Sequence, residues 1–328
     1  MLANTKHTAL VVAAEKKRKQ ADYKGALKLF QQALVISKTI QDPQTTLDVL
    51  LSMGDICRML GLFDSAIEHY EEALEMCDAL GDRLAAADAT VGLGLSYRAL
   101  GAWTDAVKLA KKARDLYRKE GDTRGIAFAM WAEAGAYRFG GKVPLAIDLF
   151  QKAKGLFQQI DYTSGVAYSL CGLGGGNRIA GKFDVSLSYY CEANELFRGL
   201  KDRFGMAYSH CGIGNAYRMI YDFRKAMQHF AKAERLYCAI GDIVSYSYTI
   251  WSMATLFIMT GEYSRAKKAV LQAQKNFRKT KDPRGLIYCD LAFGQIEFLR
   301  GKQLQALKRF QGAYQEAQAF SFAVERCH

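Results

Sequence analysis

The chain has 328 residues, half of them hydrophobic and only three of them proline, so it has apolar surface to bury and few helix breakers. Its formal net charge of +12 favours acidic partners, whether acidic peptides, nucleic acid or an anionic membrane surface. No apolar run approaches the roughly 18 residues that span a bilayer, and the cysteines form no CxxC pair. We therefore expect a cytoplasmic protein with reduced thiols and no membrane insertion.

Small residues recur every 40 residues along the whole chain, without insertions. One such column consists of Ala26, Ala66, Ala106, Ala146, Ser186, Ala226, Ala266 and Ala306. A second follows seven residues later and consists of Ala33, Ala73, Ala113, Ala153, Ala193, Ala233, Ala273 and Ala313. Between them stand mostly aromatic residues, such as Tyr70 and Phe150. Because positions i, i+4 and i+7 share one helix face, the columns predict an amphipathic helix in every unit.

An earlier column of small residues, including Gly54 and Gly174, predicts a first helix in each unit that a neighbouring helix approaches closely. Turn glycines then end this first helix at Gly61, Gly101, Gly141, Gly181, Gly261 and Gly301. Aspartates occupy the N-cap position of the next first helix at Asp42, Asp82, Asp122, Asp202, Asp242 and Asp282. The local signals and the period therefore agree on two helices per unit.

The chain thus reads as one domain, residues 1–328, of the all-α class. Its eight units span about 7–46, 47–86, 87–126, 127–166, 167–206, 207–246, 247–286 and 287–326. Two helices cannot bury their apolar faces alone, so each unit must stack on the next. We expect a right-handed α-solenoid of eight stacked helix-turn-helix repeats.

These columns resemble the tetratricopeptide consensus in order, with a small residue at Gly54, the aromatic position at Cys57 or Tyr97, and then Ala66, Tyr70 and Ala73. The usual period is about 34 residues. The longer period here resembles the group found in spindle-orientation adaptors and in bacterial peptide-sensing or transcription-regulator domains. That resemblance implies a concave groove that binds extended peptides.

The sequence also departs from this pattern at several positions. Glu133 stands where an apolar residue is expected, and Tyr221 replaces a turn glycine. Residues 321–328 are too few to form a capping helix, so the apolar face of the last unit is expected to be exposed or used for self-association.

Six arginines recur at one register on the stripe of the first helices that we expect to face the groove: Arg18, Arg58, Arg98, Arg138, Arg178 and Arg218. With repeats roughly 10 Å apart, they would form a cationic rail. Guanidinium groups suit carboxylates and phosphates because their donors form a planar fork. The alternative is that these arginines bridge acidic residues of adjacent repeats or solvate the surface.

A second column supplies one aromatic residue per unit in the C-terminal half: Phe128, Tyr168, Tyr208, Tyr248 and Tyr288. It lies ten residues before the arginines, nearly three helical turns, and so shares their stripe. Trp131 and Trp251 fall between the two columns. Asn215 stands where similar repeats bind a peptide backbone. We expect these residues in the groove, although the tyrosines could instead pack against the preceding repeat.

We expect no catalytic residues, no metal site and no cofactor. Residues 176–182 read GNRIAGK, but Phe183 stands where a phosphate-binding loop needs Ser or Thr, and no strand precedes it. The segment is instead expected to be a helix end and turn. The five histidines show no ligand spacing. Glu133 is expected at a helix edge in contact with solvent, with a buried carboxylate near Arg138 as the alternative.

The leading hypothesis is therefore a non-enzymatic adaptor, a protein–protein interaction scaffold whose concave groove binds an extended acidic segment of a partner protein. One alternative is single-stranded nucleic-acid binding along the basic groove. Another is a structural scaffold that forms homo-oligomers through its uncapped terminal repeats.

Overall fold

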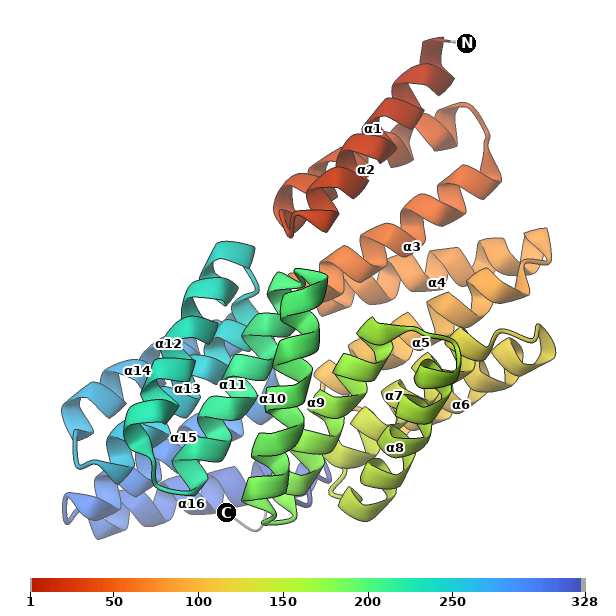
Figure 1. Ribbon diagram of the computed structural model, residues 1–328. Helices are drawn as coiled ribbons and strands as arrows, with labels where there is room; N and C mark the ends of the chain where they lie inside the picture. The colour runs from red at the N-terminus through yellow and green to blue at the C-terminus, as the bar shows by residue number, and fades with distance from the viewer. Residues whose placement is uncertain (1, 326–328) are drawn as a thin grey trace.

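The computed structural model describes residues 2–325, with side chains from residue 5 onward. Within that range the chain forms sixteen α-helices and no strand (Figure 1). The first eight are α1 (Leu2–Lys19), α2 (Tyr23–Thr39), α3 (Pro43–Met59), α4 (Phe63–Leu80), α5 (Arg83–Ala99), α6 (Trp103–Lys119), α7 (Thr123–Phe139) and α8 (Val143–Gln159). The others are α9 (Thr163–Ile179), α10 (Phe183–Leu200), α11 (Arg203–Met219), α12 (Phe223–Ile240), α13 (Ile243–Met259), α14 (Tyr263–Lys279), α15 (Pro283–Leu299) and α16 (Gln303–Ala319).

The helix ends lie where the predicted caps and turns stand. All six predicted N-cap aspartates accept a backbone N–H at the third helical position, as Asp42 does from Thr45 at 3.1 Å. The six turn glycines have φ between 73° and 94°. Tyr221, which replaces a turn glycine, adopts a similar φ of 63°. The 40-residue pattern therefore fixes the helix pairs locally, by capping and left-handed turns.

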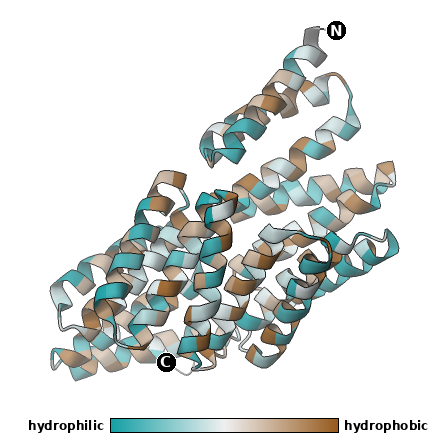
Figure 2. Ribbon diagram, in the orientation of Figure 1, coloured by the Kyte–Doolittle hydropathy of each residue, from teal (hydrophilic) through white to brown (hydrophobic). Residues whose placement is uncertain are grey.

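The small residues of the first helices make room for aromatic rings of the second helices. A Cβ on Gly54 would lie 2.6 Å from the ring of Tyr70, and one on Gly174 would lie 2.8 Å from the ring of Tyr190. The alanines that flank Tyr70, Ala66 and Ala73, have no exposed surface. Figure 2 shows the result, with hydrophobic and hydrophilic residues interspersed along the helices. Each unit thus buries one stripe per helix against its neighbours.

The superhelix closes on itself through contacts that the repeat pattern does not encode. Turns inside units 2 to 4 meet turns from units 6 to 8, and we call this line of contacts the seam. A Cβ on Gly61 would lie 2.8 Å from Val244 and 2.9 Å from Thr280. One on Gly101 would lie 2.9 Å from Phe320, and one on Gly141 would lie 2.7 Å from Ala323.

Ionic, cation–π and apolar contacts reinforce the seam. Lys281 Nζ lies 2.5 Å from Asp64 Oδ2, an exposed pair that contributes little by itself. The guanidinium of Arg284 stacks over the ring of Phe139 at 4.2 Å. Trp103 packs against a buried cluster that includes Phe322 and residues of α15 and α16. Apolar contact around Trp103 therefore contributes to the stability of the seam.

The last unit is partly covered by this seam. Ala313 and Ala317 of α16 are buried beside Phe322, whereas Leu304 and Leu307 are 79% and 51% exposed. The expected exposure of the terminal apolar face therefore holds for the start of α16 and not for its end. Among the described helices, none is long and apolar enough to cross a membrane.

Candidate functional site

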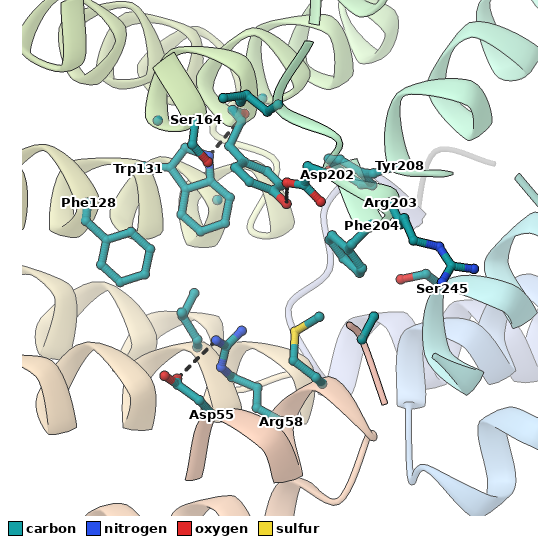
Figure 3. A pocket seen from close by; sticks show the side chains of 18 of the residues that line it. Asp55, Arg58, Phe128, Trp131, Ser164, Asp202, Arg203, Phe204, Tyr208 and Ser245 are labelled. Atoms are coloured by element: carbon teal, nitrogen blue, oxygen red, sulfur yellow. Dashed lines mark hydrogen bonds and ion pairs between the residues drawn. The ribbon is translucent and has the colours of Figure 1, made fainter. Parts of the chain in front are cut away.

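A cavity of about 750 Å³ lies inside the superhelix. Its wall is formed mainly by the first helices of units 1 to 6, from Arg18 on α1 to Tyr208 on α11, and by the turn at residues 200–204. In Figure 3, Asp55 and Arg58 stand on one side of the cavity, and Trp131, Phe204 and Tyr208 stand on the other. We call this space the bore.

The structure brings half of the predicted groove residues together around the bore. Those that line it are Arg58, Arg98, Arg138, Trp131, Tyr168 and Tyr208. The other six are not among its lining residues: Arg178, Arg218, Asn215, Tyr248, Tyr288 and Trp251. The predicted row of arginines is thus divided: Arg58, Arg98 and Arg138 line the bore, whereas Arg178 and Arg218 do not.

Arg98 reaches across to the next repeat without meeting a carboxylate among the described residues. Its guanidinium lies 5.9 Å from the ring centre of Trp131 and 5.5 Å from that of Phe139. Gly135 leaves the space that Nη1 occupies, because an added Cβ there would collide with it. Burial, followed by repulsion from Arg138, lowers the pKa of Arg98 to about 10.

Arg138 repeats this arrangement one unit later. Its Nη1 occupies the space left by Gly175, and its guanidinium lies 5.8 Å from the ring centre of Phe150. Its guanidinium interacts with the hydroxyl of Tyr208 from α11, a neutral group. Arg98 and Arg138 therefore extend into the bore as two cations for which the described residues provide no counter-charge.

The arginines toward either end of the column have partners in their own helices. Arg18 donates to Glu15 at 2.8 Å, and Arg58 donates to Asp55 at 3.3 Å. Arg218 donates to the Asn215 side chain at 3.4 Å. Asn215 also donates to the carbonyl oxygen of Cys211 at 3.1 Å, so its amide is engaged within α11.

Most of the predicted aromatic residues bond to the following repeat. Trp131 Nε1 donates to the carbonyl oxygen of Tyr168 at 3.2 Å, and Trp251 Nε1 donates to that of Tyr288 at 3.0 Å. The Tyr168 hydroxyl donates to the N-cap residue Asp202 at 2.8 Å. The tryptophan bonds reach the following unit and the Tyr168 bond reaches the N-cap of the next unit's first helix, whereas the packing alternative placed the tyrosines against the preceding repeat.

The last two tyrosines of the column bond to residues that follow the second helix of their own unit. The Tyr248 hydroxyl hydrogen-bonds the N-cap carboxylate of Asp282. The Tyr288 hydroxyl donates to Glu325 at 2.6 Å, in the segment that closes the seam. Tyr208 differs from them, because its hydroxyl interacts with Arg138 across the bore.

Sequence reasoning missed the wall that the later units contribute to the bore. Arg203, Phe204 and Ser245 line it opposite Arg58 (Figure 3). No motif marks these residues, since they reach the site only because the superhelix returns on itself. Only the path of the superhelix, and no pattern in the sequence, reveals these residues.

Glu133 corrects an expectation. It was predicted at a solvent-facing helix edge, but it is only 3% exposed. Arg114 Nη1 from α6 lies 2.6 Å from its Oε2, and Lys111 Nζ lies 3.9 Å from its Oε1. The alternative partner, Arg138, is not the one it meets. Burial raises the pKa of Glu133, against the attraction of Arg114. Its role is therefore to pair α6 with α7.

The predicted helix end at residues 176–182 is confirmed. α9 ends at Ile179, and Gly181 follows with φ of 77°. No strand precedes it in the described chain, so the segment has none of the context of a phosphate-binding loop.

Comparisons with known proteins agree with this architecture. A family model described as tetratricopeptide repeat matches residues 7–79 and 85–159. No curated protein matches the sequence. Among solved structures, a Rap protein complexed with competence and sporulation factor has a TM-score of 0.61 at 14% identity, over 98% of this chain and 94% of that one.

Two further structures are similar over nearly their full length. The Rap conjugation gene regulator of plasmid pLS20, in complex with the Phr* peptide, has a TM-score of 0.70 at 13% identity, covering 98% of both chains. The apo form of the quorum sensor NprR from B. thuringiensis has a TM-score of 0.61 at 12% identity, over 94% of this chain and 87% of that one. At such identities the likeness shows the fold alone.

The fold defines the class of this protein, an α-solenoid of stacked two-helix repeats, of which those in residues 7–159 match the tetratricopeptide-repeat model. Within that class its long units resemble those of the Rap and NprR regulators.

Proposed function

We propose that this chain is an adaptor that binds an extended acidic peptide segment inside its bore. The observation that carries the proposal is the pair Arg98 and Arg138, two enclosed guanidinium groups with no carboxylate partner among the described residues. Taking a cation out of water is costly unless it is paired. An acidic ligand would supply the missing charge.

The surrounding groups fit a ligand with both acidic and apolar side chains. Phe128 is 37% exposed and stacks on Trp131, with ring centres 5.8 Å apart, beside Arg98. Phe204 and Tyr208 offer further aromatic surface on the other side of the bore. Carboxylates of the ligand would meet the arginines, and its apolar side chains would meet these rings.

Two of the similar structures are complexes, one with competence and sporulation factor and one with the Phr* peptide. That likeness supports peptide binding as the function. The preference for acidic peptides comes from the arginines of this chain. Arg178, Arg218, Asn215 and the later tyrosines belong to the same proposed groove as its continuation beyond the bore.

The test is a calorimetric titration with a synthetic peptide that alternates glutamate with phenylalanine, compared with a twin that alternates lysine with phenylalanine. We expect the acidic peptide to bind and the basic twin to fail. Arg98→Ala with Arg138→Ala should weaken binding by about 10- to 150-fold for each arginine, since a charge-assisted hydrogen bond contributes about 1.5 to 3 kcal/mol.

A matched control is Arg118→Ala with Arg198→Ala, which removes two exposed arginines from second helices. It should leave both affinity and helicity unchanged. Equal affinity of the bore variant and the unaltered protein would refute the proposal. Binding of arbitrary oligonucleotides with a steep salt dependence would instead favour the single-stranded nucleic-acid alternative.

A further inference from the structure

The second helix of unit 2, α4, and the second helix of unit 7, α14, lie on the outer surface. The charged side chains of one are all acidic and those of the other are all basic. In α4 the charged side chains are all carboxylates: Asp64, Glu68, Glu71, Glu72, Glu75 and Asp78. In α14 they are all cations: Arg265, Lys267, Lys268, Lys275, Arg278 and Lys279. Apart from partly buried Glu72, every one of these residues is exposed.

The two charged faces share one register, because the helices lie 200 residues apart, which is five full periods. Glu68 corresponds to Lys268, and Glu75 to Lys275. In each helix these positions are seven residues apart, so they point to the same side. Leu271, 48% exposed, lies between Lys268 and Lys275 and offers apolar contact. An acidic stripe and a basic stripe of matching spacing result.

Little within the molecule neutralises either stripe. Glu72 pairs with Lys38 at 2.5 Å, and Arg265 pairs with the cap residue Glu262. Among residues 5–325 no ion pair engages Glu68, Glu71, Glu75 or Asp78, nor any of the other five cations of α14. Like charges three and four residues apart destabilise a helix. The two stripes therefore retain charge that a complementary surface would compensate.

The seam brings the end of the basic helix α14 to the start of the acidic helix α4. Lys281, two residues after α14 ends, contacts Asp64, the second residue of α4, at 2.5 Å. The basic helix thus runs up to the seam, and the acidic helix runs away from it. In Figure 1, α14 and α4 lie on opposite sides of the centre of the molecule. The boundary between the two charges is at the Asp64–Lys281 contact.

We propose that a second copy of this chain docks on this surface, with a two-fold axis near the Asp64–Lys281 contact. In that arrangement α14 of each copy lies against α4 of the other, and the same pair of contacts occurs twice. Each helix is about 25 Å long at 1.5 Å per residue, so the paired stripes match in length. The proposal is independent of the bore and its ligand.

The dimer follows from charge complementarity, so salt should dissociate it. Electrostatic attraction between exposed groups extends over a Debye length of about 10 Å at 0.1 M salt and about 3 Å at 1 M. We expect light scattering and sedimentation velocity to report a dimer at the lower salt concentration and a monomer at the higher one. A monomer at the lower concentration, over the accessible protein range, overturns the proposal.

Charge reversal gives a sharper test. Glu68→Lys with Glu75→Lys places lysines at two of the six acidic positions of α4, and Lys268→Glu with Lys275→Glu places glutamates at two of the six basic positions of α14. Each variant alone should be monomeric, and an equimolar mixture should restore a dimer that contains one copy of each. Circular dichroism checks that both variants remain folded.

Lys112→Glu with Lys119→Glu on α6 is the matched control, because it changes the net charge by the same amount at exposed positions that belong to neither stripe. It should dimerise as the unaltered chain does. A dimer that survives both reversals, or a mixture that stays monomeric, overturns the proposal. Either result is independent of whether peptides bind in the bore.

Discussion

Replacing Trp103 with alanine should open the seam. Trp103 belongs to two clusters, one within its own unit around Ala106 and one across the seam around Phe322. Truncation of a buried tryptophan costs about 3 to 5 kcal/mol, and this ring is partly exposed, so we expect a loss near 3 kcal/mol in the free energy of unfolding. The open superhelix should also have a larger radius of gyration in solution scattering.

The variant Phe183→Ala separates the loss of local packing from the opening of the seam. Phe183 holds the corresponding position in unit 5, where the adjacent turn residue, Gly181, has no neighbour within 4 Å that a Cβ would meet. Its truncation should lower stability through local packing and leave the radius of gyration unchanged. Hydrogen exchange at residues 320–325 should rise in the Trp103 variant alone. Equal exchange and equal radii in both variants would refute the seam as a closure.

Two further predictions concern buried titratable groups. Arg114→Ala leaves the carboxylate of Glu133 buried with only distant Lys111, so we expect unfolding to require about 3 to 5 kcal/mol less, whereas Arg114→Leu with Glu133→Leu should be near neutral by denaturant titration. His210 Nδ1 lies 3.1 Å from His229 Nδ1. Burial and then His229 lower the pKa of His210 from 6.5 to about 4, so the unfolded chain binds a proton there before the folded chain does. Stability should therefore fall as pH decreases through that window, and thermal unfolding of His210→Gln should show a smaller decrease; an identical pH profile would contradict this assignment.

The helix pairs, caps and turns were predictable because neighbours in sequence determine them. Asp42 caps α3 through the backbone N–H of Thr45, three residues later, and Gly61 ends a helix through its own left-handed φ. The packing of Gly54 against Tyr70 is also local, since both lie in one unit. A pattern repeated every 40 residues records such contacts directly.

The candidate site was predictable only in part. The arginine column indicated which helix stripe faces inward, and Arg98 and Arg138 do line the bore. The sequence places carboxylates three residues before Arg18 and Arg58, with which they pair, but it could not show that Arg98 would stack on Trp131. The sequence also could not show that Glu133 would be buried. Its partner Arg114 lies in the preceding unit, and which cation Glu133 pairs with depends on side-chain geometry between helices.

By itself the sequence determined a solenoid of two-helix units, because each unit's apolar stripes require only the next unit for burial. Its closure was decided by the tertiary structure alone. The contacts of Gly101 with Phe320 and of Asp64 with Lys281 join residues more than 200 positions apart, and they depend on small rotations accumulated over several repeats. Those rotations create the bore around Arg98 and bring the acidic and basic outer helices to one boundary.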